Sequence, residues 1–164
     1  MFTRSLRVFA VMLLIVTALF TGAGPALAQD SDMVDTLTGL GSYVTLSSAL
    51  VEKGVAETLA DGEYTLFAPA DAAWQALSVA DRIKLYRNAQ TLTDTLLHLT
   101  VEGSHPLAEL TDGTVLTTLL GDTLTITHVG SKVLVNGAEI TSGDIATSNG
   151  LIHSIDTVLP VAGS

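Results

Sequence analysis

The sequence of 164 residues contains no cysteine, and aromatic residues make up only 5% of it. Disulfide bonds, thiol chemistry and a lipid attached through a cysteine are therefore excluded, and the fold must be stabilised by packing. Basic residues are scarce too, because seven lysines and arginines stand against 17 acidic residues, which gives a net charge of −10. Nucleic acids are bound mainly through lysine and arginine, so we exclude them as partners.

The familiar catalytic and nucleotide-binding motifs are absent as well. The sequence contains no P-loop, no zinc-protease or nucleophile-elbow motif, and no calcium-binding loop. Its histidines also lack the mutual spacing of metal ligands. We therefore predict a protein that is not an enzyme and that needs no cofactor or metal. The enzymatic alternative is a hydrolase that uses His98, His105 or His153, which requires a nucleophile and a carboxylate within hydrogen-bond reach.

The first 28 residues have the pattern of a secretory signal peptide. Arg4 and Arg7 precede an apolar stretch over residues 8–20, and Ala26-Leu27-Ala28 has the small-residue pattern of a cleavage site. The apolar stretch is shorter than the roughly 20 residues that span a bilayer. We expect cleavage after Ala28 and a secreted protein, periplasmic or extracellular, with no integral membrane segment. Removing both arginines leaves a net charge of 5 − 17 = −12.

The spacing of apolar residues changes near the middle of the chain. Up to Gly103 it is mostly helical, with one short strand at 64–68 that ends before Pro69. Beyond Gly103 it alternates, which indicates strands, and Asn136-Gly137 is a strong hairpin signal. A helix-rich half followed by a strand-rich half is typical of an α+β fold, here with an antiparallel-dominated β-sheet.

Several local boundaries also follow from the sequence. Residues 29–42 are predicted to form a polar lead-in with one short helix at 33–37, and Gly54 to interrupt the next helical stretch. Ser142-Gly143-Asp144 is predicted to form a turn. The second Asn-Gly pair, Asn149-Gly150, is predicted to begin a final strand over 151–159.

Two long stretches resemble the signatures of the fasciclin domain family. "YTLFAPADAAWQAL" (64–77) is similar to the first, in which a strand ending in Phe-Ala-Pro meets a helix that opens with aspartate. "VNGAEITSGDIATSNGLIHSIDTVLP" (135–160) is similar to the second. The resemblance covers a single domain over 32–160 and leaves 161–164 as a tail. It implies a fasciclin-like wedge, with the helices of the N-terminal half packed on an antiparallel-dominated β-sheet or sandwich.

The resemblance also implies a function and a set of residues. The function is a non-catalytic adhesion or binding module, a monomer, with an unknown protein or polysaccharide ligand at the cell surface or matrix. The signature residues, expected to have structural roles, are Phe67, Pro69, Asp71, Asn149, Gly150, His153 and Asp156.

Between the signatures the chain departs from the family pattern. The family carries a Tyr-His pair before apolar residues and a glycine, and alignment on Gly103 puts His98 at the tyrosine and Leu99 at the histidine. A shift by one residue matches His98 to the histidine but requires an extra residue before Gly103. We take His98, Leu99, His105 and Pro106 as a possible partner surface.

The role of His153 can be argued from strand geometry. His153 lies on the more apolar face of an extended strand, whereas Asp156 lies on the opposite face, so the two do not form a dyad. We expect a buried, neutral imidazole with both nitrogens hydrogen-bonded. Its partner is expected from the strand-to-helix turn after Pro69, either Asp71 or a nearby carbonyl.

Two alternatives stay open. Asp71 is either an exposed carboxylate that contacts a ligand or an N-cap for the helix after Pro69, and we favour the cap because this position explains the residue type. The alternative function is a small-molecule or lipid carrier in the cell envelope, in which the stripe of Leu92, Leu96 and Leu99 lines a cavity.

Overall fold

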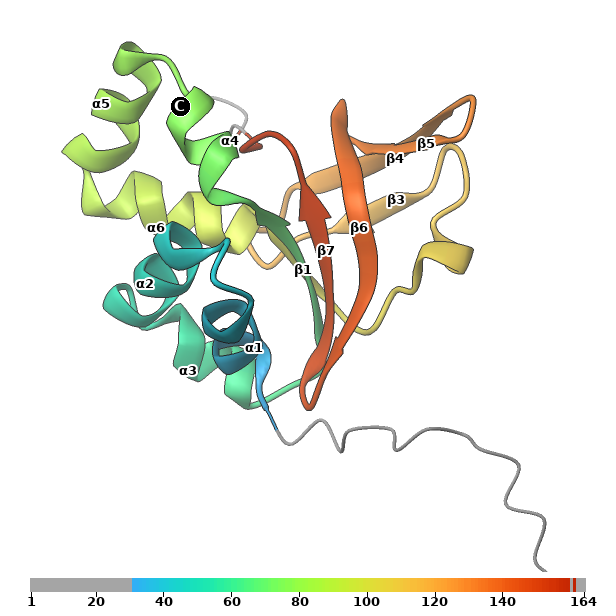
Figure 1. Ribbon diagram of the computed structural model, residues 1–164, viewed down its shortest axis with the longest axis horizontal. Coiled ribbons are helices and arrows are strands. Elements are labelled where there is room, and N and C mark those ends of the chain that lie inside the picture. Colours follow the sequence, from blue (N-terminus) through green and yellow to red (C-terminus); the bar gives the residue numbers. More distant parts are fainter. Residues whose placement is uncertain (1–30, 160, 162–164) are drawn as a thin grey trace, which may run out of the picture.

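The computed structural model describes residues 31–159 and residue 161 (Figure 1). The predicted signal peptide, residues 29 and 30 and most of the predicted tail lie outside this part. The helices are α1 (Met33–Leu40), α2 (Val44–Glu52), α3 (Val55–Ala60), α4 (Asp71–Ala76), α5 (Val79–Arg87), α6 (Ala89–His98) and the short 3-10 helix η1 (Leu107–Glu109). The strands are β1 (Tyr64–Pro69), β2 (Thr100–Glu102), β3 (Val115–Thr117), β4 (Thr123–Val129), β5 (Lys132–Val135), β6 (Ala138–Thr147) and β7 (Gly150–Ile155).

The strands form one sheet in the order β2-β1-β7-β6-β5-β4-β3. Every pairing is antiparallel except β1 with β7. The two edge strands approach each other through a bridge between Val101 and Thr118, so the sheet is nearly a barrel. Figure 1 shows the six α-helices gathered on one side, with β1, β7 and β6 between them and the β4–β5 hairpin. The predicted α+β fold is confirmed.

The hydrophobic core extends from the helices into the sheet. Leu46 of α2, Phe67 of β1, Leu96 of α6 and Ile126 of β4 are all fully buried members of one cluster. In β4 the buried Leu124 and Ile126 alternate with exposed threonines, as a strand with one solvated face requires.

The hairpin predicted at Asn136-Gly137 joins β5 to β6. Both residues have positive φ, 46° and 86°, as a two-residue type I′ turn demands. The Asn136 side chain also accepts a hydrogen bond from the Thr125 N–H at 2.8 Å, which ties the turn to β4.

The turn predicted at Ser142-Gly143-Asp144 is wrong. These residues lie inside β6, where the register with β7 shifts on both sides of Ser142 and Asp144 has a φ of 56°. The turn-forming residues therefore produce a bulge within a continuous strand. The final strand is also shorter than predicted and ends at Ile155, although Val158 and Leu159 remain buried.

Candidate functional site

The two signature stretches meet where β1 pairs with β7. Tyr64 lies opposite Gly150, whose φ is 137°, and a Cβ added there would lie 1.8 Å from the Tyr64 carbonyl oxygen. Only glycine fits this approach. Asn149 accepts the Met33 N–H at 2.8 Å and donates to the Leu59 carbonyl at 2.9 Å. The second signature therefore holds α1 and α3 against the sheet.

His153 is fully buried, and both of its ring nitrogens have partners. The Asp144 N–H donates to Nδ1 at 3.2 Å, so Nε2 carries the proton and donates to the His105 carbonyl at 2.8 Å. Burial lowers the pKa of His153 and outweighs the hydrogen bond to His105, which acts in the opposite direction. The expected partner in the turn after Pro69 is wrong, because the ring bonds the β6 bulge and the segment after β2.

Asp71 caps a helix, but not the one predicted. It is the first residue of α4, and its carboxylate accepts the N–H groups of Val44 at 3.1 Å and Thr45 at 2.8 Å, at the start of α2. The residue before α2, Tyr43, makes no side-chain cap of its own. Burial would raise the pKa of Asp71, but hydrogen bonds from Thr45 and Val44 hold it below its usual range.

The other signature residues also hold elements together. The Phe67 ring packs 5.6 Å from the His153 ring, between centroids. The Pro69 carbonyl accepts the indole N–H of Trp74, a buried residue of α4. Asp156 accepts the Glu139 N–H at 3.0 Å, which fastens the end of β7 to the start of β6.

His98 and Leu99 lie in the interior, with exposed fractions of 2% and 0%. Their inclusion in a partner surface is therefore wrong, because their side chains do not reach solvent. The apolar stripe of Leu92, Leu96 and Leu99 already indicated that Leu99 faces inward, whereas no sequence pattern indicated the burial of His98, the last residue of α6. His105 and Pro106 are half-buried and can still contribute to a surface.

His98 is paired with a carboxylate that the sequence did not indicate. Its Nδ1 lies 2.6 Å from Asp122 Oδ2, within ion-pair distance but without the angles of a good hydrogen bond, and its Nε2 is buried without a partner among the described residues. The Thr118 hydroxyl donates to Asp122, not to His98. Burial would raise the pKa of Asp122, but Thr118 and His98 hold it low. A hydrolytic triad places the histidine between the two others, so this arrangement does not match one.

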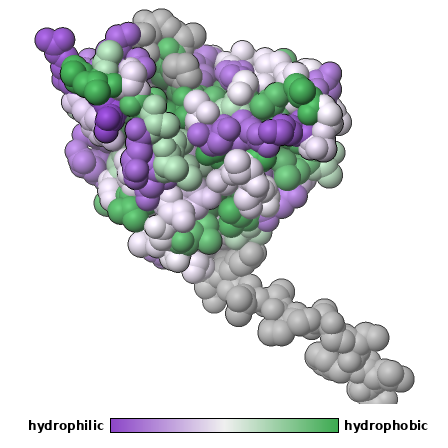
Figure 2. Space-filling view, turned by 45° about the horizontal axis from the view of Figure 1, so that its top comes forward, coloured by the Kyte–Doolittle hydropathy of each residue, from purple (hydrophilic) through white to green (hydrophobic). Residues whose placement is uncertain are grey.

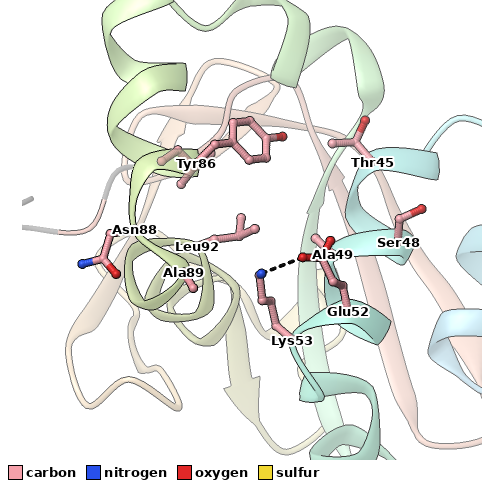
Figure 3. A pocket seen from close by; sticks show the side chains of 10 residues that line it. Thr45, Ser48, Ala49, Glu52, Lys53, Tyr86, Asn88, Ala89 and Leu92 are labelled. Atoms are coloured by element: carbon pink, nitrogen blue, oxygen red, sulfur yellow. Dashed lines mark hydrogen bonds and ion pairs between the residues drawn. The ribbon is translucent and has the colours of Figure 1, made fainter.

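The surface is hollowed between α2 and the α5–α6 corner, and we call this hollow the α2–α5 cleft (Figure 3). It is open to solvent and has a volume of about 320 Å³, within the usual range for small-ligand sites of about 300–1,000 Å³. It is lined by Thr45, Ser48, Ala49, Glu52, Lys53, Leu85, Tyr86, Asn88, Ala89 and Leu92.

The cleft has an apolar floor and polar walls. Leu92 and Ala49 are buried beneath it, and Tyr86 and Thr45 lie on opposite sides of it in Figure 3, whereas the Ser48 hydroxyl points away from it. The Lys53 ammonium lies 2.7 Å from the Glu52 carboxylate, with exposed side-chain fractions of 18% and 68%. This pair is the charged part of the wall.

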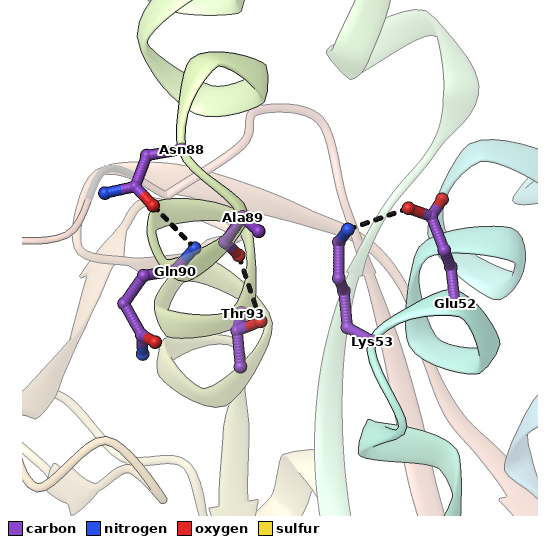
Figure 4. A network of polar contacts seen from close by, with 6 residues as sticks. All are labelled: Glu52, Lys53, Asn88, Ala89, Gln90 and Thr93. Carbon is purple, nitrogen blue, oxygen red and sulfur yellow. Dashed lines mark hydrogen bonds and ion pairs between the residues drawn. The ribbon is translucent and has the colours of Figure 1, made fainter.

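Local helix geometry fixes two of these polar residues (Figure 4). Lys53 is the C-cap of α2, and its N–H donates to the Ala49 carbonyl before Gly54 turns the chain at a φ of 72°. Asn88 is the N-cap of α6, and its Oδ1 accepts the Gln90 N–H at 3.0 Å. The end of α2 thereby places Lys53 at the cleft, whereas the Asn88 amide caps α6 and points away from the cleft in Figure 3.

Sequence reasoning missed the cleft, although one signal was present. Val79, Ile83 and Tyr86 follow helical spacing along α5, yet all three are more than half exposed. A stripe of this kind normally faces a core. Of the predicted carrier stripe, Leu96 and Leu99 are fully buried in the core, and only Leu92 reaches the floor of the open cleft. The predicted apolar cavity is therefore wrong for this stripe.

Within residues 31–159, no three histidine or acidic side chains lie close enough together to hold a metal ion. None of the helices described there is both long and apolar enough to cross a membrane.

Comparison with known proteins gives consistent relationships. The family model of the fasciclin domain matches residues 41–161. The chain is 36% identical over 130 residues to pig transforming growth factor-beta-induced protein ig-h3, covering 77% of the chain but 19% of the relative. It is 34% identical over 145 residues to the Mycobacterium bovis cell surface glycolipoprotein MPB83, covering 85% and 65%. The chain thus spans about a fifth and about two thirds of the lengths of these relatives.

A solved structure shows the same fold. It is a FAS1 domain pair from the insect cell adhesion molecule fasciclin I, which matches with a TM-score of 0.60 and 18% identity over 77% of this chain and 47% of that one.

Proposed function

The chain belongs to the fasciclin domain family, and on that basis we propose that it is an exported, non-catalytic binding module that serves adhesion at the cell surface, in the periplasm or in the extracellular matrix. One relative is named a cell surface glycolipoprotein, and the matching fold comes from a cell adhesion molecule. Its ligand is a protein or a polysaccharide, and the module acts as a monomer.

The observation that carries the proposal is how the polar signature residues are used. His153, Asp71 and Asn149 each satisfy backbone groups of other elements, and His153 is fully buried. Polar side chains that are engaged in internal hydrogen bonds stabilise the fold and are not free to exchange protons with a substrate. The α2–α5 cleft instead presents polar groups to solvent, which suits binding.

Capture in the native setting tests binding. The full chain, expressed with its own N-terminus in its source cells, is cross-linked on intact cells and in matrix, and partners are identified by mass spectrometry and glycan analysis. We expect an extracytoplasmic protein or polysaccharide to be recovered. Recovery of the bare chain alone, at every cross-linker length used, would contradict the proposal.

Export has its own test. N-terminal sequencing of the protein recovered outside the cytoplasm is expected to begin at Gln29, after removal of residues 1–28. A chain that retains Arg4 and Arg7, or that is confined to the cytoplasmic fraction, would show that the export prediction is wrong.

A further inference from the structure

We propose that the α2–α5 cleft and the outer face of α5 bind an anionic polysaccharide, a chain of sugar rings that carry carboxylate or sulfate groups. This inference rests on the proposed binding function and names the ligand class and the surface. It follows from the distribution of charge, the chemistry of the cleft walls and the exposed stripe of α5.

Positive charge is concentrated on one side of an acidic molecule. Five basic residues lie in the described part of the chain, and four of them lie on α5 or in the adjoining cleft: Lys53, Arg82, Lys84 and Arg87. Against Asp81, the three basic residues give α5 a net charge of +2, whereas the whole chain has −10. A local patch of this kind attracts an anionic partner even when the net charge is negative.

These charges are also available. Among the described residues, Arg82, Lys84 and Arg87 form no ion pair, and all three are exposed. The fifth basic residue, Lys132, lies on β5 and is paired with Glu139 at 2.6 Å. The cations of α5 can therefore pair with an incoming anion without breaking an internal contact.

The cleft walls have the chemistry that a sugar requires. A pyranose ring has an apolar C–H face and a rim of hydroxyls. The exposed Tyr86 ring offers a surface for the C–H face, and the Tyr86 and Thr45 hydroxyls offer hydrogen-bond donors and acceptors for the sugar hydroxyls (Figure 3). The Lys53 ammonium neutralises the Glu52 carboxylate of the same wall at 2.7 Å, so that its removal would leave an unpaired negative charge beside an anionic ligand.

The surface beside the cleft can hold further sugar units. Val79 and Ile83 continue the exposed apolar stripe from Tyr86 along α5, with Arg82 next to Ile83 in sequence. On the side of the molecule that holds α5, Figure 2 shows strongly hydrophilic and hydrophobic residues side by side. A polymer that leaves the cleft along α5 would meet alternating apolar and cationic groups. The cleft itself is concave and carries hydroxyl groups, so it fits a sugar better than it fits a flat bilayer.

Binding measurements with defined polymers test the proposal. The exported protein is titrated by calorimetry with polygalacturonate, dextran sulfate and neutral dextran, and by sedimentation with vesicles that contain anionic lipid. We expect the two anionic polysaccharides to bind, dextran and vesicles to bind at least about tenfold more weakly, and affinity to fall as salt rises from about 0.05 M to about 0.5 M. Binding to neither anionic polysaccharide, or tighter binding to vesicles, would overturn the proposal.

Matched variants locate the binding surface. Tyr86→Ala is expected to weaken binding of the anionic polymer by about tenfold, and Tyr86→Phe to weaken it little. Lys53→Gln is expected to weaken it by about threefold or more, whereas Lys132→Gln removes the same charge on β5 and is expected to leave it unchanged. Equal effects of Lys53→Gln and Lys132→Gln, or no effect of Tyr86→Ala, would show that the cleft is not the site.

The two proposals fail differently. If native capture recovers an extracytoplasmic protein and the anionic polymers do not bind, the binding function stands and the polysaccharide site is wrong. If native capture recovers nothing and the polymers do not bind, both fail.

Discussion

The signature region and the α2–α5 cleft treat polar groups in opposite ways. In the signature region, the side chains of His153, Asn149 and Asp71 are all hydrogen-bonded to backbone groups of other elements. In the cleft Tyr86 faces solvent, and so do the cations of the adjoining α5. Removing a buried polar partner leaves its counterpart unsatisfied, whereas removing an exposed side chain does not. The two regions should therefore respond very differently to substitution.

The largest effect is expected at Gly150. In Gly150→Ala the new Cβ would lie 1.8 Å from the Tyr64 carbonyl oxygen, at a φ of 137°, so the parallel β1–β7 pair must separate. We expect the free energy of unfolding to fall by about 3 kcal/mol or more, measured by urea denaturation. Where the variant is recovered only unfolded, loss of the native circular dichroism spectrum gives the same result.

The control for Gly150 is Gly130→Ala, in the β4–β5 turn. Gly130 also has a positive φ, 64°, but a Cβ there meets nothing within 4 Å. Its cost is expected to be only the left-handed backbone strain of about 1–2 kcal/mol. Equal losses in the two variants would show that the close approach to Tyr64 does not matter.

The second effect concerns His153. His153→Leu leaves the Asp144 N–H and the His105 carbonyl without their ring partner, and we expect a loss of about 2–3 kcal/mol in the free energy of unfolding at pH 7. The pH profile gives a second readout. Burial lowers the pKa of His153 in the folded state below the ordinary value of 6.5, so near that pH the unfolded chain binds more protons and stability rises with pH.

The contribution of the neutral ring is therefore complete above pH 6.5 and is lost as the pH falls below 6.5. We expect the difference between the native chain and His153→Leu to shrink as urea denaturation is repeated at progressively lower pH. A constant difference across this range would mean that the ring is not held neutral by the fold.

A smaller effect is expected at Asp71. Asp71→Ala removes the cap from the first N–H groups of α2, and we expect a loss of about 1 kcal/mol. Because the folded pKa of Asp71 lies below 3.8, its contribution is present above that pH and is lost as the pH falls further. The control is Asp81→Ala, which removes a carboxylate from the first turn of α5. Equal losses in the two variants would show that the cap on α2 makes no contribution of its own. Urea denaturation at pH 7 and below pH 4 gives both results.

The features that could be predicted from the sequence are those that depend on a local pattern of residues. The change from helical to alternating spacing predicted the α+β fold, and Asn136-Gly137 predicted its hairpin, since both signals act over a few residues. The partners of His153 and Asp71 could not be predicted, because they come from residues 48 and 26 positions away, at His105 and Thr45. The Ser142-Gly143-Asp144 bulge was misread because the same residues favour turns and bulges.

The cleft escaped prediction for another reason. Its lining comes from helices α2, α5 and α6, and no short motif spans them. The excess of acidic residues also concealed the basic character of α5, since net charge says nothing about distribution. Exposure, rather than sequence pattern, distinguishes the α5 stripe from a core-facing one.

The smallest effect on stability is expected in the cleft. It tests most sharply whether the exposed cleft and the buried signature region respond differently to substitution. Tyr86 is 55% exposed, so Tyr86→Ala should change the free energy of unfolding by less than about 0.5 kcal/mol, while it weakens polysaccharide binding. Phe67→Ala, which removes a fully buried ring, should cost about 3–5 kcal/mol. If Tyr86→Ala destabilised the chain as strongly as a core change, the ring would be part of the packing, and the exposed α5 stripe would be structural rather than a surface kept for a ligand.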